Sequence, residues 1–246
     1  MPVKVIINGA RGRMGQALIE SAKDFENLEV VATLDVGDDI TSFTESTDAL
    51  IDFTHASASS SLIKTMLAAK KPLVIGTTGQ DATVRQEIAA ASKSIPIVFA
   101  PNFSVGVNTL FWLTQKATEA LGEDFDLEVV EMHHRLKKDA PSGTARRLAE
   151  ILTETRGLNY EKDCRHGREG MVGERTKKEI GIHSMRGGDV VGDHTVIYAT
   201  EGERLELTHK ASSRNTFARG ALRAAVWSVN QAPGLYDMQD VLGLKN

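Results

Sequence analysis

The sequence predicts an α/β protein with a doubly wound parallel sheet, followed by a second, α+β domain with a mixed sheet. Over residues 1–104, short apolar runs rich in β-branched residues alternate with segments whose apolar residues recur at helical spacing. This alternation is typical of parallel strands joined by helices that cover both faces of a sheet. After residue 178 three strand-like runs follow one another closely, which indicates an antiparallel or mixed sheet.

The composition bounds the class of protein. A chain of 246 residues with 41% hydrophobic residues can bury a core in one large or two smaller domains. The net charge of −4 gives no support to general nucleic-acid binding, because cations are not in excess. The single cysteine, Cys164, excludes an internal disulfide and fits a reducing compartment. We see no signal peptide and no apolar run of bilayer length, so we expect a soluble, cytoplasmic protein.

The first element is a buried strand over Val3–Asn8, followed by the turn Gly9-Ala-Arg-Gly-Arg-Met-Gly15 and a helix over residues 16–23. Glycines in such a turn let the backbone approach a pyrophosphate at the helix N-terminus. The Gly-x-x-Gly-x-x-Gly spacing differs from the commoner Gly-x-Gly-x-x-Gly, so the turn alone is moderately specific. A βαβ unit that binds no nucleotide is the alternative.

The second strand, Leu28–Leu34, ends at Asp35, twenty residues beyond Gly15. A carboxylate at this place accepts hydrogen bonds from the ribose hydroxyls of NAD. It also repels a 2′-phosphate, and Arg11 and Arg13 in the turn partly offset that repulsion. We therefore expect a Rossmann-like domain that uses NADH or NADPH, with NADH modestly favoured.

Three further strands alternate with helices and complete this sheet. Each strand runs into a polar or glycine-rich turn, and in parallel sheets ligands bind at the carboxyl ends of the strands. We expect strands over 49–54 and 95–100, a strand within 72–79 that runs into a glycine-threonine turn, and helices over 57–70 and 81–92. Their turns predict one rim for one ligand, formed by residues 9–15, 35, 54, 76–79 and 100–103.

The remaining elements form the second domain and return to the first. A long apolar helix over 105–121 leads into a strand that begins at Asp126, and the polar stretch 156–178 reads as a loop. The amphipathic helix at 216–230 is expected to pack on the first domain. We expect strands at 126–132, 180–186, 194–199 and 204–209, a helix around 144–155, and domains over 1–104 with 215–246 and over 105–214.

The segment Glu131-Met-His-His-Arg-Leu-Lys-Lys-Asp-Ala-Pro-Ser-Gly-Thr144 joins a strand to a helix. A helix N-terminus with cations beside it is suited to a ligand with more than one carboxylate or phosphate. The histidines add a proton donor that works near neutral pH. The alternative is a solvated basic loop with its helix cap.

The other histidines and the cysteine give weaker indications of a functional site. His55, His183, His194 and His209 are more often structural or on the surface than catalytic. The neighbours His133 and His134 point to opposite sides of an extended segment, and no second pair has metal-ligand spacing, so we expect no metal. Cys164 lacks a matching histidine and acid, which argues against a thiol nucleophile.

With both halves considered, the chain resembles the 4-hydroxy-tetrahydrodipicolinate reductase (dihydrodipicolinate reductase) family over essentially its whole length. The resemblance implies an enzyme of lysine and diaminopimelate biosynthesis, a dinucleotide-binding domain completed by the C-terminal helix, a substrate-binding and tetramerisation domain, and a homotetramer. The segments that carry it are Gly9–Gly15, Asp52–Thr54, Gly76–Gly79, Ala100–Gly106, Glu131–Thr144 and Arg186–His194.

The family's functional residues carry over onto matching positions. The resemblance implies that His133 is the general acid, that Lys137 is a second catalytic group, and that His134, Gly143 and Thr144 bind substrate. Some members place an arginine directly after the ribose-binding acid, where this chain has Val36, and this weighs against a strong NADPH preference. The implied cofactor-binding residues are Gly9, Ala10, Arg11, Gly12, Arg13, Met14, Asp35, Gly76, Thr77, Thr78, Ala100, Pro101, Asn102 and Phe103.

The implied reaction transfers hydride from the nicotinamide to ring C4 of a cyclic dicarboxylate imine, and the resulting enamine is then protonated. His133 as an imidazolium supplies that proton, and Lys137 and the helix end aim a carboxylate. Two alternatives remain: another nicotinamide oxidoreductase that acts on a small dicarboxylate, and a non-catalytic NAD-sensing module.

Overall fold

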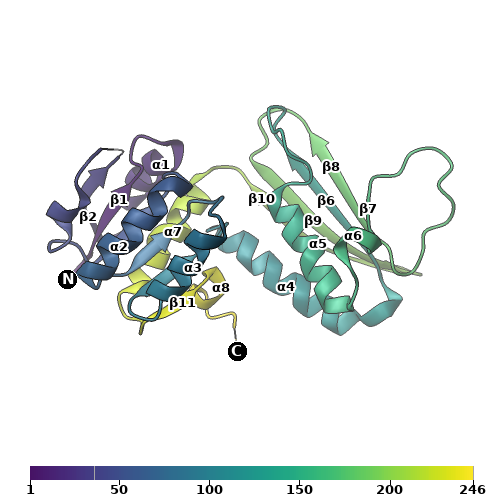
Figure 1. Ribbon diagram of the computed structural model, residues 1–246. Helices are drawn as coiled ribbons and strands as arrows, with labels where there is room; N and C mark the ends of the chain where they lie inside the picture. The colour runs from purple at the N-terminus through teal and green to yellow at the C-terminus, as the bar shows by residue number, and fades with distance from the viewer. Residues whose placement is uncertain (36, 246) are drawn as a thin grey trace. The chain divides into compact units, whose positions relative to one another are not determined.

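A computed structural model describes residues 1–35 and 37–245. The expectation about Val36 lies outside the described residues. The chain forms two compact units, Met1–Val105 with Arg214–Asn246, and Gly106–Ser213. The ribbon in Figure 1 shows the helices and strands of each unit.

The N-terminal unit is built on a six-stranded sheet in the order β11-β5-β4-β3-β1-β2. Every neighbouring pair is parallel, so the predicted doubly wound sheet is confirmed. Because the strand order reverses between β1 and β3, the crevice suited to a ligand lies at their carboxyl ends. The strands are β1 (Val3–Asn8), β2 (Leu28–Leu34), β3 (Ala49–Asp52), β4 (Leu73–Ile75), β5 (Pro96–Phe99) and β11 (Gly234–Tyr236).

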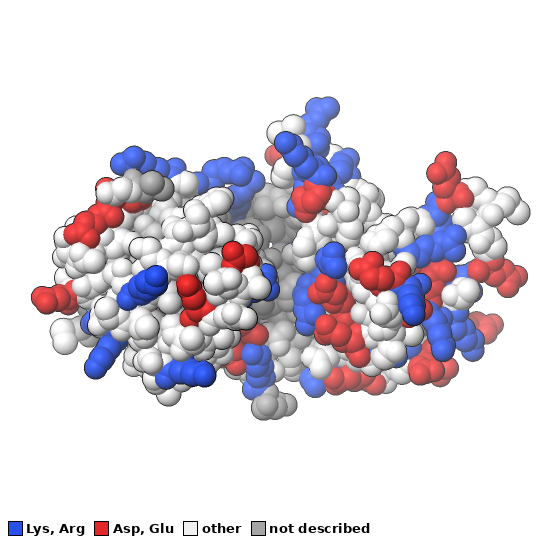
Figure 2. Space-filling view, in the orientation of Figure 1, with Lys and Arg blue, Asp and Glu red and all other residues white. Residues whose placement is uncertain are grey.

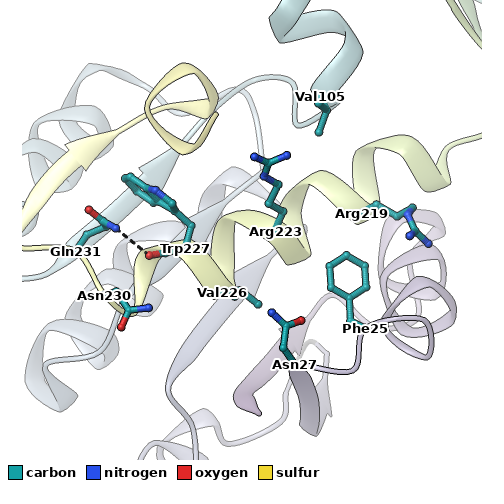
Figure 3. Close-up of a pocket in the computed structure, with 9 residues that line it drawn as sticks. All are labelled: Phe25, Asn27, Val105, Arg219, Arg223, Val226, Trp227, Asn230 and Gln231. Atoms are coloured by element: carbon teal, nitrogen blue, oxygen red, sulfur yellow. Dashed lines mark hydrogen bonds between the residues drawn. The ribbon is translucent and has the colours of Figure 1, made fainter. Parts of the chain in front are cut away.

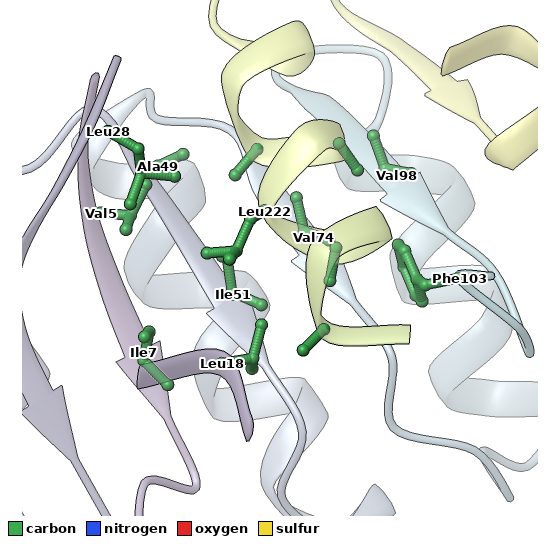
Figure 4. Close-up of a cluster of buried hydrophobic side chains, with 14 of the residues drawn as sticks. Val5, Ile7, Leu18, Leu28, Ala49, Ile51, Val74, Val98, Phe103 and Leu222 are labelled. Atoms are coloured by element: carbon green, nitrogen blue, oxygen red, sulfur yellow. The ribbon is translucent and has the colours of Figure 1, made fainter. Parts of the chain in front are cut away.

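Helices cover both faces of this sheet because its buried strands are apolar on both sides. On β1, Val5 and Ile7 pack toward α1, α7 and α8, whereas Ile6 packs toward α2 and α3. Leu222 of α7 points at Ile51 in the centre of the first cluster (Figure 4). The helices are α1 (Arg13–Ala22), α2 (Ser59–Ala69), α3 (Ala82–Ala91), α7 (Asn215–Ser228) and α8 (Met238–Val241), with short 3-10 turns η1 (Ile40–Phe43) and η2 (Ala56–Ala58).

The C-terminal unit contains a five-stranded sheet in the order β10-β9-β6-β8-β7. β6 pairs parallel with β8 and antiparallel with β9, so the expected mixed sheet is observed. α4 and α5 pack on one face, where Tyr198 is fully buried and its hydroxyl donates to the Thr114 carbonyl at 2.9 Å. The elements are α4 (Val105–Leu121), η3 (Gly122–Asp124), β6 (Asp126–His133), α5 (Gly143–Arg156), α6 (Tyr160–Asp163), β7 (Cys164–His166), β8 (Ile180–Arg186), β9 (Gly192–Thr200) and β10 (Glu203–Ala211).

The stretch 156–178 is more ordered than a plain loop, because it contains α6 and β7. Its arginines attach it to the sheet: Arg175 donates to Glu128 at 3.0 Å and to Asp126 at 2.7 Å, and Arg168 donates to Glu128 at 2.7 Å. Figure 2 shows side chains of both signs interspersed over this unit. Burial raises the pKa of Cys164 to about 11, which agrees with the expectation that it is no nucleophile.

Two features of the described residues, 1–35 and 37–245, bear on function. None of their helices is long and apolar enough to cross a bilayer. They contain no group of three or more histidine, cysteine or acidic side chains that could hold a metal ion.

Candidate active site

The glycine turn between β1 and α1 is held in a shape that only glycine permits at two positions. Gly9 has φ +87°, and a Cβ there would stand 2.7 Å from the Phe53 carbonyl oxygen. A Cβ on Gly15 would stand 2.1 Å from the Gly9 oxygen. The N-cap of α1 is Gly12, whose lack of a side chain leaves the N–H groups of the first turn without a side-chain cap. A helix N-terminus of this kind suits a pyrophosphate.

Asp35 lies directly beside the glycine turn. Its carboxylate accepts a hydrogen bond from the backbone N–H of Arg11 at 2.8 Å, and the N–H groups of Gly9 and Ala10 donate to the Leu34 carbonyl at 2.9 and 3.0 Å. Asp35, Gly9, Gly12 and Thr54 line a cavity of about 500 Å³. The side chains of Arg11 and Arg13 are exposed.

A buried carboxylate, Asp52, joins the strand ends that form the rest of the rim. It accepts hydrogen bonds from Asn8 at 3.2 Å, from the Thr54 hydroxyl at 2.7 Å and from the Thr77 hydroxyl at 2.7 Å. Burial raises the pKa of Asp52 against these hydrogen bonds. The Asp52 carboxylate therefore links the ends of β1, β3 and β4, and the Thr77 side chain is one of its hydrogen-bond donors.

Phe53 brings the last two predicted turns to the same edge. A Cβ on Gly76 would stand 2.1 Å from the Phe53 ring, and the ring lies edge-on to Phe103 with centroids 5.7 Å apart. Gly76, Ala100 and Phe103 thus follow β4 and β5 at one rim with the glycine turn. Of the other predicted cofactor residues, Met14 and Asn102 are half-buried, and Thr78 and Pro101 are exposed.

A second cavity of the N-terminal unit, also about 500 Å³, contains none of the residues that the sequence predicted. Phe25, Val226 and Trp227 form its apolar walls, and Arg219 and Arg223 lie at its edge (Figure 3). The Arg219 guanidinium donates a hydrogen bond to the Asp24 carboxylate at 2.8 Å and lies over the Phe25 ring.

In the C-terminal unit, His133 is the last residue of β6. Alternation along β6 turns Glu131 and His133 to the same buried face, and they are 0% and 9% exposed. The His133 Nδ1 lies 2.6 Å from a carboxylate oxygen of Glu131. Arg186, at the end of β8, donates to both oxygens of Glu131 at 2.9 Å. Neither Glu131 nor Arg186 is among the site residues predicted from the sequence, although both lie in segments that carry the resemblance.

His194 lies against His133, with ring centroids 5.1 Å apart. Its Nε2 is 3.0 Å from the hydroxyl of Ser142, the N-cap of α5. Burial, assisted by the nearby His133, lowers the pKa of His194 to about 3, so His194 is neutral at physiological pH. The expectation that His194 is structural or on the surface did not place it beside His133.

The loop from residue 134 to 142 returns to β6, because the Ser142 N–H donates to Glu131 at 3.2 Å. Lys137 forms an ion pair with Asp139 at 2.9 Å, and its N–H donates to the His134 carbonyl at 3.1 Å. The Lys137 side chain is 19% exposed, whereas Lys138 is an exposed residue. His134 is half-buried.

The predicted substrate-binding residues Gly143 and Thr144 begin α5, directly after its cap. The Ser142 hydroxyl accepts from the Ala145 N–H at 3.1 Å. The first turn of α5 contains no acidic side chain of its own, and the carboxylate nearest to this helix end is Glu131, which accepts from the Ser142 N–H. The loop over residues 134–142 thus joins His133 to the N-terminus of α5, and its last residue is bonded back to Glu131 beside His133.

Comparisons with known proteins decide the family. The family model described as "Dihydrodipicolinate reductase, N-terminus" matches residues 3–103, and "Dihydrodipicolinate reductase, C-terminus" matches residues 106–242. The chain belongs to the dihydrodipicolinate reductase family. The predicted resemblance is thereby confirmed, and the protein is a nicotinamide-dependent oxidoreductase.

Curated relatives agree over the full length. The 4-hydroxy-tetrahydrodipicolinate reductase of Akkermansia muciniphila is 57% identical over 242 residues, which cover 98% of each chain. That of Syntrophotalea carbinolica is 44% identical over 266 residues, covering 99% of this chain and all of the relative.

Solved structures share the fold at low identity. A dipicolinate-bound dihydrodipicolinate reductase from Paenisporosarcina sp. TG-14 has a TM-score of 0.76 and 24% identity, covering 98% of this chain and 99% of that one. A myo-inositol dehydrogenase from Corynebacterium glutamicum has a TM-score of 0.59 and 14% identity, covering 99% and 94%. These likenesses confirm the fold class.

Proposed function

We propose that the protein reduces 4-hydroxy-tetrahydrodipicolinate to tetrahydrodipicolinate in lysine and diaminopimelate biosynthesis, with NADH or NADPH as the hydride donor. One observation carries the proposal: the His133 Nδ1 lies 2.6 Å from the buried carboxylate of Glu131. The loop that follows His133 contains Lys137 and leads to the N-terminus of α5. A proton donor beside a dicarboxylate site is what this reaction needs. The family and the relatives' names support the same reaction.

The dinucleotide would bind at the rim of the N-terminal sheet. The first-turn N–H groups of α1 suit its pyrophosphate, and Asp35 suits the adenosine ribose hydroxyls. Bound there, the nicotinamide supplies the hydride. Gly76 and Phe103 would line the other half of the rim. Because Gly76 has no side chain, the Phe53 ring lies directly against it.

The substrate's carboxylates would meet Lys137 and the N–H groups of Gly143 and Thr144, with His134 beside them. The helix end and the ammonium group both favour negative charge. Holding the ring there orients its reacting carbons toward His133. His133 then gives its proton to the enamine carbon that hydride addition leaves behind, and it is reprotonated from solvent.

We also propose a homotetramer in the cytoplasm. Assembly through the mixed sheet is supported by the face opposite α4 and α5. Alternation places the half-buried Thr195 and Ile197 and the exposed Thr208 on that face. Light scattering of the purified protein across a dilution series measures the assembly state.

The reaction is tested by NADH and NADPH oxidation coupled to dihydrodipicolinate synthase, which generates the unstable substrate. We expect turnover by the wild type and a loss on the order of 10²–10⁴-fold in His133→Gln, with a small change in KM. Cofactor oxidation with another dicarboxylate but not with this substrate would indicate a different reductase. Cofactor binding with no turnover of any acceptor would indicate a sensor.

A further inference from the structure

The carboxylate behind His133 is enclosed by donors. Glu131 and His133 lie two residues apart on β6, so both side chains project into the same buried layer. One oxygen of Glu131 contacts the His133 Nδ1 at 2.6 Å, each oxygen accepts from Arg186 at 2.9 Å, and the Ser142 N–H adds a fourth contact at 3.2 Å. Of these groups, only His133 takes part in a chemical step of the reaction proposed above.

The charge of Glu131 determines where His133 holds a proton. Burial would raise the pKa of Glu131, but hydrogen bonds from Arg186 and His133 outweigh it and lower the pKa below its usual range. An ionised carboxylate only accepts hydrogen bonds. The 2.6 Å contact therefore requires a hydrogen on Nδ1 of His133, in the neutral ring as well as in the imidazolium.

The other ring nitrogen of His133 is left for proton transfer. Nε2 lies beside Gly192 at the start of β9, where an added Cβ would stand 3.0 Å from Nε2. Because Gly192 has no side chain, no Cβ crowds that nitrogen. Proton gain and loss then occur at one atom, because Nδ1 stays bonded to Glu131.

Arg186 fixes the carboxylate itself. Besides its two bonds to Glu131, its guanidinium donates to the carbonyl oxygens of Asp139 at 2.7 Å and of Met185 at 2.6 Å. The guanidinium thus joins β6, β8 and the loop that carries Lys137. The backbone completes the frame, since the Gly187 N–H donates to the His133 carbonyl at 3.0 Å.

We propose that Glu131 is the positioning residue of the acid, and that Arg186 keeps Glu131 ionised and in place. Glu131 holds one hydrogen on Nδ1 of His133, so that Nε2 delivers the transferred proton. An acid bonded to the distal nitrogen of a histidine fixes its tautomer and orientation in this way. The identity of the proton acceptor rests on the function proposed above; the tautomer does not.

The strand offers a matched control. Glu128 lies on the opposite face of β6, is ion-paired with Arg168 and Arg175, and contacts His183 at 2.8 Å. Glu131→Gln and Glu128→Gln remove the same charge from buried or half-buried glutamates of one strand. Arg186→Lys is the second test variant, because it keeps a charge but loses the two-pronged contact.

Two measurements on the full-length protein decide the proposal. Long-range ¹⁵N–¹H NMR of labelled histidine, assigned through His133→Gln, reports which ring nitrogen of His133 carries hydrogen. Steady-state kinetics separates kcat from KM. We expect a protonated Nδ1 in the wild type and in Glu128→Gln, and a population with a bare Nδ1 in Glu131→Gln. The kcat of Glu131→Gln should fall roughly 10–100-fold with KM within about threefold, and Arg186→Lys should fall less.

A bare Nδ1 in the wild type would overturn the proposal, and this result does not depend on the folding of the Glu131 or Arg186 variants. Wild-type kcat together with an unchanged His133 spectrum in Glu131→Gln would also overturn it. If the spectra behave as expected while the wild type does not reduce the substrate, the proposed function fails and the positioning of His133 by Glu131 stands.

Discussion

The carboxylate of Asp35 accepts a hydrogen bond from the backbone N–H of Arg11 at 2.8 Å, so the residue suited to a ribose also holds the glycine turn in place. Replacing Asp35 therefore has two effects that different substitutions separate. Asp35→Asn keeps an acceptor for the Arg11 N–H and removes the charge. Asp35→Ala removes both.

We expect the wild type to use both cofactors and to favour NADH by no more than about 100-fold, since each decade corresponds to about 1.4 kcal/mol. Asp35→Asn should weaken NADH and spare or improve NADPH, because the repulsion of a 2′-phosphate disappears. Asp35→Ala should weaken both, NADH more. The ratio of kcat/KM for the two cofactors measures this. A strong wild-type NADPH preference that neither substitution changes would show that Asp35 does not contact the ribose.

The two lysines of the loop should differ in function as they differ in exposure. The Lys137 side chain is 19% exposed. Lys137→Ala should lower kcat/KM at least tenfold and raise KM, because a charge-assisted hydrogen bond contributes roughly 1.5–3 kcal/mol. The exposed Lys138 serves as the control, and Lys138→Ala should stay within about twofold. Equal losses in steady-state kinetics would contradict the assignment of Lys137 to the substrate.

Gly192→Ala should reduce kcat roughly 10–100-fold, since a methyl group 3.0 Å from Nε2 of His133 displaces either the ring or the reacting carbon. Cofactor affinity should not change, because Gly192 belongs to the C-terminal unit and the glycine turn to the other. Fluorescence titration with NADH checks the affinity. A fully active Gly192→Ala protein would mean that the proton does not pass on that side of the ring.

The ion pairs of Glu128 should make stability depend on pH in acid. Burial would raise its pKa, but hydrogen bonds from Arg168, His183 and Arg175 lower it to about 2. Because its pKa is lower in the folded state, ionised Glu128 stabilises the folded protein at pH values above 4.5, the pKa in the unfolded state. This contribution is lost as the pH falls from 4.5 toward 2.

Glu128→Gln should accordingly lower the free energy of unfolding near neutral pH by on the order of 2 kcal/mol. The difference from wild type should shrink through the same acid range. Urea unfolding at a series of pH values measures it. A difference that does not depend on pH would attribute the loss to packing rather than to charge.

Much of the fold could be predicted because most of its elements are locally distinct. The bounds of β1, β2, β8 and α4 agree with the predicted ranges, since each is a compact, patterned run between polar turns. β7 and β11 escaped prediction. They are three-residue edge strands, Cys164–His166 and Gly234–Tyr236, and their extended form comes from pairing with β8 and β5 rather than from their own residues.

The candidate site divides in the same way. The sequence drew attention to His133, Lys137 and the start of α5 because they lie close together in the chain. Arg186 meets Glu131 across 55 residues, and His194 meets Ser142 across 52. Such contacts depend on β6 lying between β8 and β9, and no local pattern in a single sequence reveals that order.

The N-terminal unit is assembled from both ends of the chain, and this has a consequence during protein synthesis. Ribosomes release the N-terminus first, so β1 to β5 emerge long before α7 and β11. Ala218, Ala221 and Leu222 of α7 cover Ile51 and Val74 in the finished core. Until α7 emerges, the part of this face that α7 covers stays exposed to solvent, whereas all strands of the C-terminal unit have already been translated. The N-terminal unit is thus begun first and completed last.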